Sequence, residues 1–136
     1  MQQQNTIISE SSKLSFYRKF YEFGKRALYV DELTNRNDRS HLAKLRLSAH
    51  SLEIERGRYS KKAKTDRICT LCKDNKIEDE NHFIWHCPIY KHERELFEYK
   101  LSHLYNPFKM KNDISKNKIL FQSKSKKSTK VIIILY

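Results

Sequence analysis

The side chains best suited to chemistry are three cysteines and one histidine that lie close together near the middle of the chain. Cys69, Cys72, His82 and Cys87 follow the spacing C-x2-C-x9-H-x4-C, and they include every cysteine of the 136-residue sequence. Three thiolates and one imidazole form a closed, tetrahedral ligand set of the kind that holds structural zinc. The short C-x2-C step lets one tight turn present two sulfurs to the same ion. The spacing therefore predicts one Zn2+ bound by these four residues.

Two further histidines, His86 and His92, offer a rival ligand set with the first two cysteines, at the spacing C-x2-C-x13-H-x5-H. This set leaves Cys87 unused beside a ligand and places His92 inside an expected helix. Three thiolates also bind zinc more tightly than a set that wastes one, so we favour His82 with Cys87. The remaining alternative is three free thiols in a buried corner of the fold, without a metal.

The charge of the chain is strongly basic on both sides of this motif. The formal net charge is +12, from 28 basic and 16 acidic residues. Residues 1–68 carry +7, residues 69–87 carry −2, and residues 88–136 carry +7. A basic balance of this size favours a polyanionic partner, RNA or DNA first. The alternative is a solvated lysine-rich surface that has no specific partner.

The sequence pattern predicts a mainly α fold: a small helical domain with an inserted Cys3His zinc-binding loop. Only two glycines and two prolines punctuate the chain, which favours helices with short links over a turn-rich β fold. Apolar periodicity predicts helices over about 12–28, 39–56, 88–105 and 113–121. The aromatic stripe of the first helix is expected in the core. A cap at Asn37 or Asp38 and a stop at Gly57 would bound the second helix.

We expect a single unit over residues 1–136, because no repeat and no Gly/Pro-rich linker divides the chain. Its parts are an N-terminal helical part with a basic link (12–67), a zinc knuckle (68–88) and C-terminal helices (89–136). The sequence ends inside the apolar run VIIILY. We therefore expect the C-terminal part to be truncated.

The basic link is the expected contact surface for nucleic acid. From Arg36 to Arg67 the chain carries 10 basic and 4 acidic residues. Basic groups interleaved with an aromatic side chain can contact phosphates and stack a base. The residues predicted to bind RNA or DNA are Arg46, Arg56, Arg58, Tyr59, Lys61, Lys62, Lys64 and Arg67.

Other signals bound the compartment and the chemistry. An odd cysteine count with metal-like spacing suits a reducing, intracellular compartment, either nucleus or cytoplasm. No secretory signal and no apolar run of the length of a membrane span is present, so no membrane association is expected. The six aspartates include no Asp-Asp pair, and no phosphate-binding glycine loop occurs. We therefore expect no enzyme activity and no small-molecule substrate.

The segments LRLSAHSLEIERGRY, RICTLC, ENHFIWHCPIY and ERELF together resemble the region after the reverse-transcriptase domain in non-LTR (LINE-like) retrotransposon polyproteins. The resemblance covers about residues 14–97 and is most specific over 46–59 and 69–88. It implies a fragment or derived remnant whose knuckle helps to bind template RNA or target DNA. Only the Cys3His set carries over by position. The x9 gap is longer than that of the gag-type knuckle C-x2-C-x4-H-x4-C, so the gag mode of single-strand binding is not implied.

The sequence thus favours a zinc-dependent nucleic-acid-binding module that is an accessory, non-catalytic part of a reverse transcriptase. The competing hypothesis is a structural or protein-interaction domain that zinc staples together. A continuous basic strip beside the knuckle would favour the first hypothesis, and scattered lysines with an exposed apolar groove would favour the second.

Overall fold

Helices make up nearly all of the regular structure in the computed structural model, which describes residues 13–20, 24, 30, 33–104 and 108–121. The α-helices are α3 (Arg36–Arg46), α4 (Glu53–Tyr59), α5 (Lys91–Leu104) and α6 (Asp113–Phe121). The shorter turns are η1 (Tyr17–Lys19), η2 (Lys64–Asp66), the π-helical η3 (His82–His86) and η4 (Pro88–Tyr90). Among the described residues, the one β contact is an antiparallel bridge between Ile68 and Ile77. The predicted mainly α fold is confirmed.

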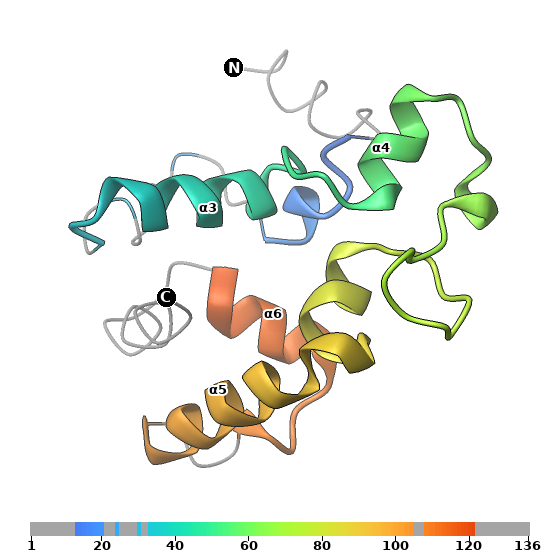
Figure 1. Cartoon of the computed structure of the whole chain (residues 1–136). Coiled ribbons are helices and arrows are strands. Elements are labelled where there is room, and N and C mark those ends of the chain that lie inside the picture. The colour runs from blue at the N-terminus through green and yellow to red at the C-terminus, as the bar shows by residue number, and fades with distance from the viewer. Residues whose placement is uncertain (1–12, 21–23, 25–29, 31–32, 105–107, 122–136) are drawn as a thin grey trace.

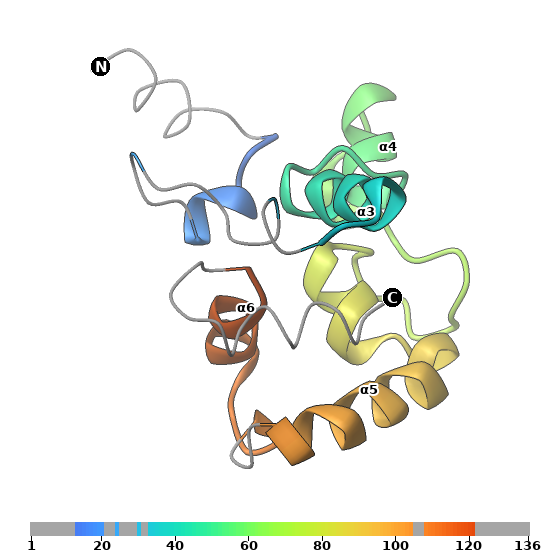
Figure 2. The same cartoon turned by 90° about the vertical axis from the view of Figure 1, so that its left-hand side faces the viewer.

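Helices α3 and α5 lie on opposite sides of the η3–η4 segment, and α6 packs beside them (Figure 1; Figure 2). One apolar cluster joins these elements. It is built from Phe16, Phe20, Leu33, Leu42, Trp85, Phe97, Leu101, Phe108, Leu120 and Phe121. Residues far apart in the sequence therefore share one core. The loop after α4 and the metal-ligand segment project to one side of this core (Figure 1).

Two of the expected helices are confirmed at their predicted places, α5 up to Leu104 and α6 at Asp113–Phe121. Nearly half of the helix predicted over 12–28 lies outside the described residues. The described part, 13–20 and 24, forms turns and η1 and no α-helix, so the prediction is wrong there, but Phe16 and Phe20 are buried as expected for core residues. In the described part of the chain, no helix has the length and apolar character needed to cross a lipid bilayer.

The single helix predicted over 39–56 is wrong: two helices occupy this stretch, and α3 begins earlier, at Arg36, with Asn35 as its cap. The break comes from Ser48, which has a left-handed backbone with φ of 52°. Ser48 N donates to Leu45 O at 3.3 Å, and Ala49 N donates to Lys44 O at 2.7 Å. This pair of bonds is the Schellman ending of a helix, which usually uses glycine at the left-handed position.

Helix α4 then begins at a point that the local sequence does not mark, because its N-terminal cap comes from a distant residue. Its N-cap residue, Leu52, has no side chain that can accept a hydrogen bond. The amide of Glu53 instead donates to the buried Glu78 carboxylate at 2.7 Å, and Ile54 N donates to Glu78 O at 3.1 Å. Satisfying two orphan amides in this way avoids a cost of about 1–3 kcal/mol for each buried group left unpaired.

Gly57 does not stop a helix, contrary to the prediction, because it lies inside α4 and is buried. A Cβ atom at this position would lie 2.5 Å from Cγ of Arg67. The Arg67 guanidinium is fixed by bonds to the carbonyls of Lys62 and Ile54 at 2.9–3.1 Å. Glycine is therefore required here for the close passage of the Arg67 side chain, which ties the loop after α4 back onto the helix.

We expect Gly57→Ala to lower the free energy of unfolding by about 1–2 kcal/mol, because overpacking outweighs the gain in helix propensity. In an Arg67→Ala background the same substitution should instead raise it, by up to about 1 kcal/mol. Urea unfolding of the four proteins of this cycle measures the coupling. An equal effect of Gly57→Ala in both backgrounds would show that the close contact is not responsible.

Candidate metal centre

The structure brings the four predicted metal ligands together. The ligand atoms of Cys69, Cys72, His82 and Cys87 all lie within 4.8 Å of one another, and all four residues are buried. Nε2 of His82 lies 3.3 Å from Sγ of Cys72, so this nitrogen faces the sulfurs. Metal–sulfur distances of about 2.3 Å and metal–nitrogen distances of about 2.0–2.1 Å place tetrahedral ligand atoms about 3.5–3.8 Å apart. The cluster therefore matches a four-ligand metal site, and its donors could hold a metal ion.

A tight turn over residues 68–77 presents the first two sulfurs. The Ile68–Ile77 bridge closes this turn, and Cys69 N donates to Lys76 O at 2.9 Å. Asn75 adopts a left-handed backbone with φ of 50°. Asparagine tolerates that conformation better than most residues, which explains why a segment without glycine can turn here.

A single π-turn brings the other two ligands together. Asp79 Oδ1 accepts a hydrogen bond from His82 N at 2.8 Å and so starts the turn. Cys87 N then donates to His82 O at 2.7 Å, five residues back, which is the spacing of a π-helical bond. Pro88 begins η4 directly afterwards and lacks the amide that would continue the turn. The x4 spacing of the motif thus has a local structural cause.

Burial changes the acid–base behaviour of the cluster in the metal-free protein. Burial raises the pKa of the Cys69 thiol to about 11. The pKa of the Tyr90 hydroxyl is also raised, first by burial and then by the nearby Cys87, Glu78 and Cys69. Tyr90 packs against the three cysteines, and its ring also contacts Phe83 at a centroid distance of 5.0 Å. The Tyr90 ring therefore covers part of the cysteine cluster.

Two buried carboxylates connect the metal-ligand segment to the helices, and the sequence analysis identified neither. Glu78 accepts a hydrogen bond from the Cys69 thiol at 3.4 Å while its other oxygen caps α4. Glu80 accepts from Ser48 Oγ at 2.9 Å and lies 3.1 Å from Nε2 of His50. Burial disfavours the charged form of Glu80, but the bonds with His50 and Ser48 outweigh it, so its pKa is lowered.

The rival ligand set is not assembled. His86 is exposed, and its Nε2 lies 2.5 Å from a carboxylate oxygen of Asp113 on α6. His92 is exposed on α5. Neither histidine belongs to the group of residues whose ligand atoms converge.

The predicted nucleic-acid residues fall into two groups. Three of them use their guanidinium groups in contacts inside the protein. Arg46 is only 6% exposed, and its guanidinium lies over the ring of Tyr17. Arg58 pairs with Glu55, and Arg67 binds backbone carbonyls. Arg46 therefore does not lie on the surface, where a phosphate-binding residue was expected.

The other five predicted residues are exposed and follow one another along α4 and the loop after it. We call them the basic strip; they are Arg56, Tyr59, Lys61, Lys62 and Lys64. Arg56 and Lys62 lie 3.3 and 3.6 Å from Glu53, but their side chains are 66% and 52% exposed. The Glu53 side chain is only 7% exposed, so each pair joins an exposed cation to a buried carboxylate.

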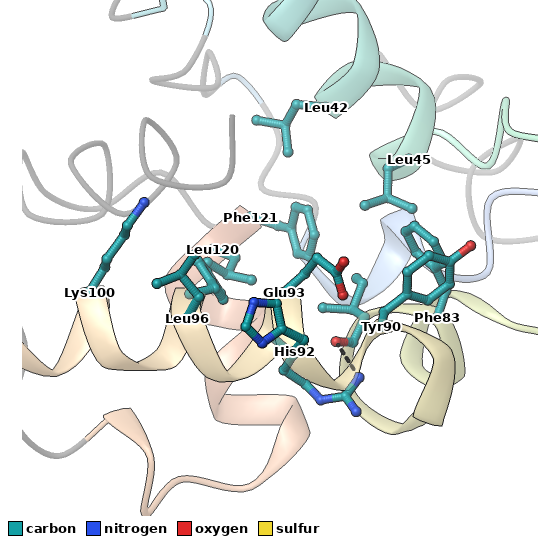
Figure 3. A pocket seen from close by; sticks show the side chains of 13 residues that line it. Leu42, Leu45, Phe83, Tyr90, His92, Glu93, Leu96, Lys100, Leu120 and Phe121 are labelled. Atoms are coloured by element: carbon teal, nitrogen blue, oxygen red, sulfur yellow. Dashed lines mark hydrogen bonds between the residues drawn. The ribbon is translucent and has the colours of Figure 1, made fainter.

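An apolar cavity of about 460 Å3 lies between α3 and α5. Figure 3 shows Leu42 and Leu45 of α3 facing Leu96 and Lys100 of α5 across it, with Phe121 of α6 behind. Tyr90 lines this cavity and also packs against the cysteines. The metal-ligand cluster and the cavity are therefore adjacent, and both contact the Tyr90 ring.

Comparison of the chain with protein-family models, with curated proteins and with solved structures finds no match. The retrotransposon resemblance therefore stays a hypothesis, and the site is interpreted from its own geometry.

We expect the purified protein to hold one zinc per chain, and Cys72→Ser to lose it. Structural zinc contributes about 10–16 kcal/mol of apparent folding free energy in small peptides, so the segment 69–88 should unfold in this variant while the apolar core survives. Metal analysis with circular dichroism measures both effects. Wild-type protein without stoichiometric metal, and unchanged by a chelator, would contradict the metal centre.

The raised pKa of Cys69 predicts the pH dependence of metal binding. The thiol keeps its proton in the metal-free protein at neutral pH, and zinc must displace that proton. The apparent affinity should therefore rise at least about tenfold for each pH unit. A thiol with the usual pKa of about 8.5 would begin to lose this slope near pH 8.5. The slope should persist at that pH because the pKa of Cys69 is well above about 8.5. Chelator competition between pH 6.5 and 8.5 measures the slope, and a flat profile would refute the prediction.

Proposed function

We propose that the chain is a zinc-stapled, non-catalytic module that binds nucleic acid through phosphate contacts of the basic strip. The observation that carries this proposal is the exposure of the strip directly before the metal-ligand segment. Among the described residues, no acidic group pairs with Lys61 or Lys64. Cations that have no internal partner retain their attraction for phosphate.

Zinc is the proposed metal because of the donor chemistry. Three thiolates and one imidazole in a closed set suit zinc, and a closed set leaves no open position for a water or a substrate. With zinc bound, the three thiolates leave the site with a charge of −1. The metal centre itself would therefore attract phosphate poorly. Its proposed role is to fix the segment that Glu78 links to α4, and the neighbouring cations supply the attraction.

The origin proposed for this module is the region after the polymerase domain of a non-LTR retrotransposon. The support is the resemblance of the sequence segments around the basic strip and around the metal ligands. On this proposal the partner is RNA or DNA, and the module acts as an accessory to a separate polymerase.

One observation favours a second function, a protein-interaction domain that zinc holds together. The cavity between α3 and α5 is lined mainly by apolar side chains, and Leu96 at its edge is about half exposed. Apolar surface of this kind is common at protein contacts. The two functions use different surfaces of the molecule, so substitutions can separate them.

We expect binding of RNA and DNA oligomers to weaken steeply with salt, with a logarithmic slope of about −0.7 for each phosphate contact on single strands and about −0.9 on duplex. Replacing Arg56, Lys61, Lys62 and Lys64 together by alanine should flatten this slope and weaken all sequences alike. A titration over a range of salt concentrations measures both.

A matched control removes four exposed lysines from elsewhere on the surface: Lys91, Lys100, Lys109 and Lys118. The control loses the same charge and should keep most of the slope if the strip is the binding site. Equal effects of the two quadruple variants would reduce the attraction to net charge alone. Binding by the strip variant that is as tight as wild type at every salt concentration would favour the protein-interaction function.

A further inference from the structure

Tyr59 is a large aromatic side chain that the fold leaves in water. It is 69% exposed and ends α4 at the centre of the basic strip. Tyr99 of α5 has nearly the same exposure, 65%, but its ring packs edge-on against His103 at 4.7 Å. Exposed tyrosines are common enough that exposure alone decides nothing. The surroundings of Tyr59 are what distinguish it.

A cation held from inside the protein supports the Tyr59 ring. The guanidinium carbon of Arg58 lies 4.4 Å from the ring centroid. Two nitrogens of Arg58 bond one carboxylate oxygen of Glu55, both at 3.0 Å, and the Glu55 side chain is only 5% exposed. The ring is thus braced by a guanidinium that is itself anchored to a buried carboxylate. Side chains that are ordered before binding lose less entropy when a ligand arrives.

The backbone next to Tyr59 is fixed as well, so Lys61 and Lys62 follow the ring in a tethered turn. Lys61 has a left-handed backbone with φ of 56°, which turns the chain back toward α4. Lys62 N donates to Gly57 O at 2.8 Å, and Lys62 O accepts two bonds from Arg67. The result is an aromatic ring with a cation behind it and a tethered turn of lysines beside it.

We propose that Tyr59 stacks on an unpaired base, so that the module selects single-stranded over duplex nucleic acid. This inference rests on the phosphate-binding function proposed above and names its substrate class. In a duplex, both faces of every internal base are covered by neighbouring bases. A single strand can turn a base outward onto an aromatic ring while lysines follow its phosphates. Arg58 and Glu55 are positioning residues, because they hold the ring and do not contact the base.

The test compares Tyr59→Leu with the matched control Tyr99→Leu and the conservative variant Tyr59→Trp, all as the zinc-loaded 136-residue protein. Stacking on one base contributes enough that its loss should weaken binding of a single-stranded oligomer by about 5- to 150-fold. Tyr59→Leu should show this loss with an unchanged salt slope, because no phosphate contact is removed. Tyr99→Leu and Tyr59→Trp should bind like wild type. Wild type and Tyr59→Leu should bind a duplex of the same length with equal affinity.

An oligomer with abasic sites gives an independent measurement. Wild-type protein should bind this strand as weakly as Tyr59→Leu binds the intact strand, because both lack one partner of the stack. Equal binding of Tyr59→Leu and wild type to the intact strand, with the strip variant still weakened, would overturn the stacking inference and leave the phosphate-binding function standing. Absence of salt-dependent binding to every oligomer would overturn both.

Discussion

One constraint determines how the metal-ligand segment and α4 are arranged. Three buried cysteine sulfurs and one imidazole nitrogen lie within 4.8 Å of one another. As thiols they are weak hydrogen-bond donors and offer little cohesion, and as thiolates they repel one another. A cation at their centre would remove this conflict and join the turn at 68–77 to the turn at 82–87. Glu78 lies between the two turns and links them to α4: its amide donates to Arg67 O at 2.9 Å beside the first turn, and its carboxylate caps the helix.

This arrangement connects metal binding to the surface proposed for nucleic acid. Helix α4 has only seven residues, and isolated helices of that length are not stable in water. Its start is held by Glu78, and the side chain of Arg67 passes Gly57 and bonds Ile54 O and Lys62 O, which ties the following loop back onto the helix. A metal that holds the two turns together would therefore also hold the segment that carries Glu78, and with it the start of the helix that presents the basic strip. On the opposite side, the apolar core holds α3, α5 and α6 together without any metal ligand.

The sequence predicted the parts of the structure that depend on local spacing. The ligand set, α6 and most of α5 follow from motif spacing, apolar periodicity and the proline after Cys87. The break between α3 and α4 could not be predicted in this way. Its left-handed residue is Ser48 where glycine or asparagine is usual, and a distant carboxylate, Glu80, binds its hydroxyl group.

Other errors also came from tertiary contacts. Gly57 was interpreted as a helix stop, but it is needed because Arg67 passes close to it ten residues later. Arg46 was counted as a surface cation, but it is buried over Tyr17. Charge composition indicates how many cations a segment has, but not which of them the fold uses internally. The basic strip could be defined only after these internal partners were known.

Zinc-edge X-ray absorption of the zinc-loaded protein tests the central claim most directly, because it counts the atoms bound to the metal. The account predicts three sulfurs at about 2.3 Å and one nitrogen at about 2.0–2.1 Å. A coordination shell with two sulfurs and two nitrogens would point to the rival histidines, and a shell of oxygens would indicate adventitious metal. Either result would contradict a centre built from Cys69, Cys72, His82 and Cys87.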